Sequence, residues 1–183
     1  VYDELLDAYK ENKKKNGTRK EFLEMAAEIE GIYVPQFYDA EYHEDGTLKS
    51  FEPNNPHAKR TIKKQVVMDL SAVPYPTKPV VPFIKVTQDR VVLEIQRGCI
   101  RGCRFCQAGM IYRPTREKDL ETLKQYAYEM LKNTGHEEIS LSSLSSSDYS
   151  QLKELVTFLI EEFKGKGINI SLPSLRIDSF SLD

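Results

Sequence analysis

The sequence has little excess charge, no long apolar run and few cysteines. Its 183 residues include 26 Lys and Arg against 28 Asp and Glu, a net charge of −2, so the overall charge favours neither a nucleic acid nor an anionic membrane as partner. No apolar stretch approaches the roughly 20 residues of a membrane-spanning helix. The first residues, starting with Val1, resemble neither a signal peptide nor a translation start. We therefore expect a soluble chain, without a membrane partner, that begins partway through a longer gene product.

The cysteines are too few and too clustered for a disulfide framework. All three, Cys99, Cys103 and Cys106, lie within eight consecutive positions. An odd number of thiols on one loop indicates a reducing compartment, so we expect a cytoplasmic protein. The hydrophobic content of 40%, with 10% aromatic residues, is typical of a folded globular protein.

The cysteine spacing, Cys99-x3-Cys103-x2-Cys106, points to iron–sulfur chemistry. A [4Fe–4S] cluster that is fully ligated by protein needs four cysteines. Three thiolates can hold three of its irons, which leaves the fourth iron open for a small molecule. We expect Gly98 and Gly102 to let the backbone turn tightly around such a cluster.

This loop resembles the C-x3-C-x-(aromatic)-C signature of the radical S-adenosylmethionine (SAM) superfamily, with Phe105 as the aromatic residue. The run from Asp89 to Arg116, which includes Gln107-Ala108-Gly109-Met110-Ile111-Tyr112-Arg113-Pro114, is similar to an uncharacterised bacterial family of radical-SAM Fe–S oxidoreductases. Nearly the whole chain is similar to the middle of that longer protein.

The resemblance implies two cofactors and an enzymatic activity. The metal ligands would be Cys99, Cys103 and Cys106, holding a [4Fe–4S] cluster, and S-adenosyl-L-methionine would bind the open iron. Reductive cleavage of SAM would give a 5′-deoxyadenosyl radical that acts on an unknown substrate. A flavodoxin or ferredoxin would supply the electron. Phe105 would shield the cluster or lie near the adenine, although ordinary packing explains an aromatic residue as well.

From Val91 onward the sequence predicts an α/β fold. Short apolar strands alternate with amphipathic helices, a pattern typical of right-handed crossovers and a parallel sheet. The predicted elements are strands at 91–96, 138–144 and 168–172, and helices at 117–132 and 149–164. Asp148 with Gln151 is expected to cap the second helix. The resemblance implies that residues 85–183 form the first half of a partial (β/α)6 radical-SAM barrel.

An incomplete barrel has consequences for partners and activity. Its third strand would present an unpaired edge, which we expect the N-terminal segment or a second copy of the chain to cover. The remainder of the full-length chain is a further expected partner. We also expect this fragment alone to be weakly active or inactive.

The residues before the barrel form two predicted segments. Residues 1–32 read as two helices, the tail of an upstream domain, with a capping box from Thr18 to Glu21. Residues 33–84 read as a β-hairpin and a proline-rich connector, with the hairpin strands at 37–42 and 47–51.

The SAM contacts depart from the pattern of the superfamily. Many members bind the SAM amino group with a Gly-Gly-Glu type segment after the second strand. This chain has serines there, of which Ser142, Ser143 and Ser145 can bond an ammonium or a ribose. Arg176 and Asp178 are similar to an Arg-x-Asp in related families, and Arg176 suits the SAM carboxylate. A serine-rich turn and a structural salt bridge are the alternatives.

Several other interpretations stay open at this point. Arg97, Arg101 and Arg104 alternate with the thiols and favour an electrostatic role beside an anionic cluster, although they can also be surface residues. A zinc site lacks a nearby fourth ligand, and a thiol switch leaves the third cysteine unexplained. The chain can also be an RNA-associated or partner-binding module with a vestigial cluster, given basic residues at 59–64.

Overall fold

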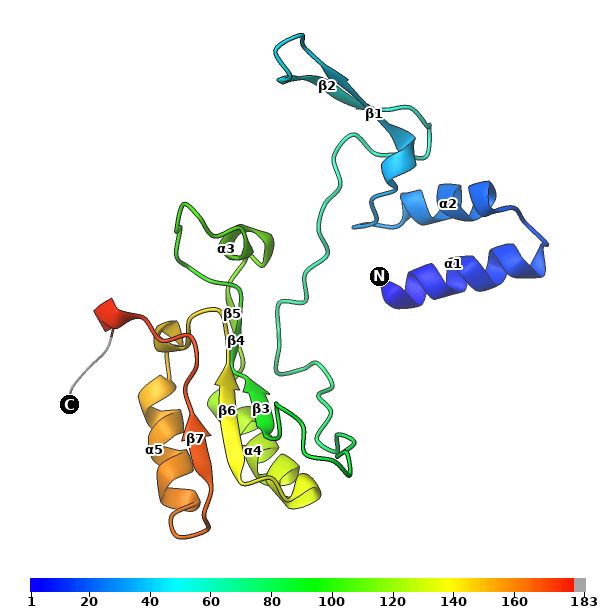
Figure 1. Ribbon diagram of the computed structural model, residues 1–183. Helices are drawn as coiled ribbons and strands as arrows, with labels where there is room; N and C mark the ends of the chain where they lie inside the picture. The colour runs from blue at the N-terminus through cyan, green and yellow to red at the C-terminus, as the bar shows by residue number, and fades with distance from the viewer. Residues whose placement is uncertain (180–183) are drawn as a thin grey trace. The chain divides into compact units, whose positions relative to one another are not determined.

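The computed structural model describes residues 1–179 and divides the chain into two compact units, Val1–Val67 and Met68–Asp183 (Figure 1). The predicted three segments, 1–32, 33–84 and 85–183, stay a prediction, and the last four residues of the third lie outside the described residues. Within the described part, no helix is both long enough and apolar enough to cross a bilayer.

The first unit contains two helices and a β-hairpin, as predicted. The helices are α1 (Tyr2–Lys14) and α2 (Arg19–Glu28), and the hairpin pairs β1 (Tyr38–Tyr42) with β2 (Leu48–Pro53) in antiparallel register. A 3-10 turn, η1 (Pro35–Phe37), precedes the hairpin.

The predicted capping box starts α2. Thr18 Oγ1 accepts a hydrogen bond from the Glu21 amide at 3.3 Å, and the Glu21 carboxylate accepts one from the Thr18 amide at 2.6 Å. Beyond the hairpin, residues 54–90 contain no helix or strand, and the proline-rich connector stays a prediction.

The second unit is built on a three-stranded parallel sheet in the order β3-β6-β7. Its strands are β3 (Val91–Glu94), β6 (Glu138–Ser142) and β7 (Asn169–Ser171). The connecting helices are α4 (Leu120–Thr134) and α5 (Leu152–Glu162). The predicted order of three parallel strands and two helices is therefore confirmed, while closure into a partial barrel stays a prediction.

One face of this sheet packs on the two helices and forms the core. Alternate strand residues and the apolar helix stripes share it, and each fully buried Leu contributes roughly 1.5–3 kcal/mol. The fully buried members are Val91, Leu93, Ile95, Leu123, Ala127, Ile139, Leu141, Leu155 and Leu159.

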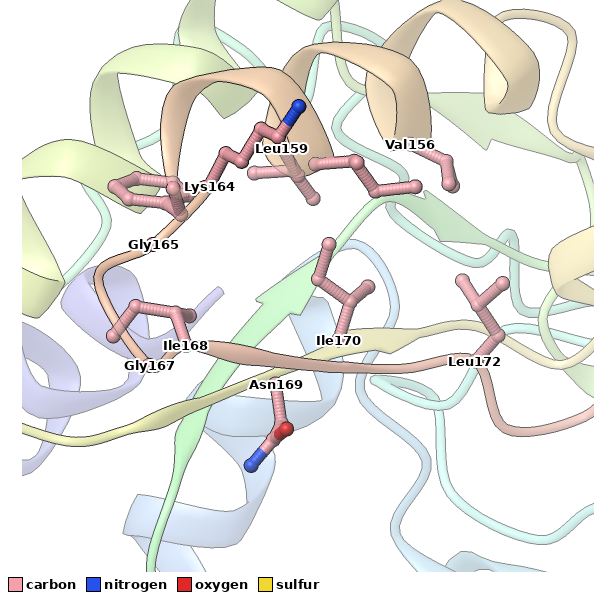
Figure 2. A pocket seen from close by; sticks show the side chains of 11 residues that line it. Val156, Leu159, Lys164, Gly165, Gly167, Ile168, Asn169, Ile170 and Leu172 are labelled. Atoms are coloured by element: carbon pink, nitrogen blue, oxygen red, sulfur yellow. The ribbon is translucent and has the colours of Figure 1, made fainter.

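The opposite face of the sheet is polar. Strand alternation places Glu94, Ser142 and Ser171 away from the helices, and Glu94 lies opposite Ser142 in the parallel register. In Figure 2, Asn169 likewise points to the side of β7 opposite Ile170.

The edge strand β7 pairs only with β6 among the described residues. An apolar groove of about 670 Å³ runs between β7 and α5, where Ile170 and Leu172 face Val156 and Leu159 (Figure 2). Coverage of this edge by the N-terminal segment or by a second copy of the chain stays a prediction.

Several predicted boundaries are wrong. The strands predicted at 138–144 and 168–172 are Glu138–Ser142 and Asn169–Ser171, and the helix predicted at 149–164 is Leu152–Glu162. The 91–96 strand ends at Glu94, and the helix predicted from 117 begins at Leu120, behind the N-cap Asp119. The cap predicted for α5 is also wrong, because Gln151 is the N-cap and no side chain bonds there. Asp148 instead closes the 3-10 turn η2 (Ser146–Asp148) and makes an ion pair described below.

Candidate iron–sulfur site

The two ends of the cysteine loop, residues 98–115, lie next to each other in the second unit. Two short strands, β4 (Gln96–Arg97) and β5 (Arg116–Glu117), pair antiparallel at its base, and the Lys118 amide donates to the Ile95 carbonyl at 2.9 Å. The loop follows β3, at the carboxyl ends of the parallel strands, where ligands of such sheets bind. Figure 1 shows β4, β5 and the short helix α3 (Ala108–Ile111) beyond the tip of β6.

Gly98 allows the two ends of the loop to approach each other. Its φ of +91° lies in the region that favours glycine, and a Cβ there would lie 2.7 Å from the Tyr112 carbonyl oxygen and 3.0 Å from that of Pro114. The Arg116 guanidinium donates to the Pro114 carbonyl at 2.9 Å. The expected need for glycine is therefore met at position 98. Gly102 has no such neighbour within 4 Å, so the protein itself gives no reason for glycine at that position.

The three cysteines form no disulfide with one another and differ in exposure. Cys99 is buried, whereas Cys103 and Cys106 are half-buried. The Arg101 amide donates to Cys99 Sγ at 3.4 Å, and the Cys106 amide donates to the Cys103 carbonyl at 3.0 Å, which makes a tight turn between the second and third thiols.

The donor set suits a cluster better than a single ion. Among residues 1–179, no three His, Cys, Asp or Glu side chains converge on a point that could hold one metal ion. A cluster binds each thiolate through a different iron, so its three cysteines need not converge. Three thiols on one loop, two of them accessible, therefore fit three corners of a [4Fe–4S] cluster in number and chemistry.

An ion pair ties the cysteine loop to the segment after β6. Arg101, between the first two cysteines, donates from Nε to Asp148 Oδ2 at 2.9 Å and from a terminal nitrogen to Oδ1 at 2.5 Å. The Asp148 side chain is only 5% exposed. The bidentate contact lowers the pKa of Asp148, because the guanidinium stabilises the ionised carboxylate. The loop is thereby fixed beside the serine-rich turn.

The serine-rich segment lies at the same end of the sheet as the cysteine loop. Ser142 ends β6, and its carbonyl accepts from the Ile95 amide at 3.0 Å. Ser143 Oγ accepts from the Ser145 amide at 3.1 Å and lies 3.1 Å from the Ser146 hydroxyl. These bonds support the alternative of a structural turn for Ser143. Contacts of Ser142, Ser143 and Ser145 with SAM stay a prediction.

Arg176 and Asp178 pair with each other after β7. Arg176 Nε donates to Asp178 Oδ1 at 2.9 Å, and a terminal nitrogen donates to Oδ2 at 2.7 Å. The pKa of Arg176 is raised, mainly by Asp178 and more weakly by a contact with Cys103, so this arginine lies beside the cysteine loop. The geometry supports a structural salt bridge here. A contact of Arg176 with the SAM carboxylate stays a prediction.

The other candidates are placed less centrally. Phe105 is 93% exposed, so ordinary packing within this chain does not explain it. Arg97 donates two hydrogen bonds to Glu94, at 2.6 and 2.7 Å, which neutralises much of the charge it would offer a cluster. In the basic 59–64 segment, Arg60 forms an ion pair with Glu52 at 2.8 Å, so part of the positive charge of that segment is neutralised.

The sequence analysis missed Gln96. This side chain is 1% exposed, and neither its Nε2 nor its Oε1 has a hydrogen-bond partner among the described residues. The alternation of side chains along the strand could have indicated this position. Because Ile95 faces the core, its neighbours Glu94 and Gln96 face the opposite, polar side. Both line a pocket of about 270 Å³ with Ser142, at the ends of β3 and β6.

The comparisons with known proteins agree with this placement. The family model described as "Radical SAM superfamily" matches residues 93–182. The chain is 32% identical over 160 residues to "Uncharacterized protein MJ0966" of Methanocaldococcus jannaschii, an alignment that covers 87% of this chain and 34% of that protein. The chain thus spans about a third of the length of this relative. No solved structure matches.

Proposed function

Residues 93–182 belong to the radical SAM superfamily, and from this premise we propose that the chain is the iron–sulfur part of a SAM-cleaving enzyme. Cys99, Cys103 and Cys106 hold a [4Fe–4S] cluster whose fourth iron binds SAM. When bound, cluster and SAM together supply a 5′-deoxyadenosyl radical that abstracts hydrogen from a substrate. The observation that supports this most is the placement of three clustered thiols at the carboxyl ends of the parallel strands, inside the matched region.

The residues around the thiols would position and protect the cofactors. The Arg101–Asp148 pair holds the loop against the end of the sheet, and the close approach at Gly98 fixes its base. The exposed Phe105 ring would cover the bound cluster from water or lie near the adenine of SAM. These roles require order before cofactor binding, which the backbone contacts of the loop provide.

SAM itself would be held by the polar groups nearest the open iron. We assign its amino group and ribose to Ser142, Ser143 and Ser145, and its carboxylate to Arg176. Since Arg176 is paired with Asp178, SAM binding would either exchange partners at this arginine or add to the pair.

The proposal also includes partners and location. A flavodoxin or ferredoxin in the cytoplasm would supply the electron, and the rest of the full-length protein would complete the substrate pocket. Since the chain spans about a third of its relative, the substrate and the reaction class, oxidoreductase or transferase, belong to that whole protein.

Anaerobic reconstitution tests the function. The wild-type chain should take up about four irons and, with SAM and a reductant, release 5′-deoxyadenosine, slowly if at all without the rest of the barrel. Cys99→Ala, Cys103→Ala and Cys106→Ala should each lose the iron, while Thr61→Ala, an exposed change in the first unit, should keep it. Absence of iron from the wild type, with salt-sensitive RNA binding instead, would favour a binding module and overturn the proposal.

A further inference from the structure

Strand β4, just beyond the end of β3, carries a buried amide that no part of the site described above uses. Gln96 lies three residues before Cys99, is 1% exposed, and leaves both its donor and its acceptor unpaired among residues 1–179. Burying an amide without partners is costly, so such a side chain indicates a ligand that supplies them.

The pocket around Gln96 is small and has few open charges. It holds about 270 Å³ at the ends of β3 and β6, lined among others by Glu94, Arg97 and Tyr112. Glu94 and Arg97 neutralise each other through two hydrogen bonds of 2.6 and 2.7 Å. Ser142 and Ser143, which also line the pocket, are assigned above to SAM, so the polar capacity that remains for a further ligand comes from the neutral Gln96 amide. A neutral ligand group therefore suits the pocket better than an anion or a cation.

The chemistry of the amide narrows the ligand further. A primary carboxamide presents a donor and an acceptor side by side in one plane, so its full complement is a planar edge with one acceptor and one donor. Lactam and imide rings have that edge, since a ring N–H lies beside a ring carbonyl. Tyr112 and Leu144 add apolar surface to the pocket walls, against which such a ring can pack.

We infer that Gln96 binds the lactam or imide edge of a planar heterocycle, and that this ring is part of the substrate. Gln96 Nε2 donates to the ring carbonyl, and Oε1 accepts from the ring N–H. The identification of the ring as substrate rests on the proposed function, because Gln96 is three residues from the first cluster ligand. The binding itself does not, since the pocket needs neither iron nor SAM.

Ligand-observed NMR on the iron-free chain tests the inference with a matched pair of probes. We expect 1-methyluracil, which keeps the imide edge, to bind at least about tenfold more tightly than 1,3-dimethyluracil, which lacks the ring N–H. This comparison needs no variant. Equal binding of both probes, or binding of neither, would overturn the inference.

Two variants test whether Gln96 is the residue that contacts the probe. Gln96→Leu should abolish the preference for 1-methyluracil, whereas Gln125→Leu, on the exposed side of α4 where Gln125 bonds Glu129, should keep it. If Gln96→Leu does not fold, judged by circular dichroism, Gln96→Glu takes its place, because it keeps the shape and loses the amide donor.

Competition distinguishes a substrate from SAM. Adenosine and SAM should leave the bound 1-methyluracil in place, and displacement by either would show that Gln96 belongs to the adenine site, against the inference. Iron uptake by the Gln96 variants should equal that of the wild type. A wild-type chain that takes up iron normally but does not distinguish the two probes would contradict the inference alone, and a wild-type chain that takes up no iron but keeps the probe selectivity would contradict the proposed function alone.

Discussion

Gly98→Ala is the substitution whose effect follows most directly from the structure of the loop. An alanine at φ +91° costs about 1–2 kcal/mol or more in backbone strain. Its Cβ would meet three backbone atoms of residues 112–115 at 2.7–3.0 Å, and relieving such overpacking typically costs about 1–3 kcal/mol. Because these neighbours are backbone, no side-chain rotation relieves the contact. The sum, about 2–5 kcal/mol, is a large fraction of a typical stability of about 5–15 kcal/mol.

Urea unfolding of the iron-free chain, followed by circular dichroism, measures this loss. The midpoint for Gly98→Ala should fall by about 1 M urea or more. Gly102→Ala is the matched control, since it lies in the same loop with no atom within 4 Å of its Cβ, and its midpoint should change little. A Gly98→Ala protein as stable as Gly102→Ala would refute the closed base of the loop.

Three further predictions concern the second unit. Asp148→Asn should remove a pH dependence of the folding stability. The Arg101 contact lowers the pKa of Asp148 below its ordinary value of 3.8, so the ionised carboxylate stabilises the fold above that pH and this stabilisation is lost as the pH falls further. Acid unfolding curves of the variant should lack this component. Asp119→Ala removes the N-cap of α4 and should cost about 1 kcal/mol in chemical unfolding. Leu159→Ala, in the core, should cost about 2–5 kcal/mol, whereas Ile160→Ala, 55% exposed one position later, should cost far less in the same assay.

The main elements of the fold could be predicted from the sequence because their signals are local. The spacing of Leu123 and Ala127 marks the buried stripe of α4, and Thr18 with Glu21 marks the start of α2 within four residues. The alternation of Val91, Leu93 and Ile95 likewise marks a strand whose one face is buried. Each pattern depends on neighbours in sequence, so no knowledge of the tertiary structure was needed.

The features that the sequence analysis missed depend on residues distant in the chain. The β4–β5 pairing joins two-residue strands about 20 positions apart, too short to leave a periodic pattern. Asp148 resembles a helix cap in sequence, but its partner Arg101 lies 47 residues earlier, and a bidentate guanidinium is a stronger partner than a backbone amide. The orphaned amide of Gln96 can be recognised only once its surroundings are known.

The candidate site was predicted unevenly for the same reason. The metal ligands could be predicted because their spacing within one loop is visible in the sequence: Cys99, Cys103 and Cys106. The SAM contacts depend on where three strand ends meet, and there the structure offers competing partners: Asp178 for Arg176, and Ser145 for Ser143.

Electron paramagnetic resonance of the anaerobically reconstituted, reduced chain tests the central claim most directly. Three thiolates that leave one iron open predict a [4Fe–4S]⁺ signal whose g values change when SAM is added, and which is lost in Cys103→Ala. A chain without any cluster signal, or with a signal that SAM leaves unchanged, would contradict the account.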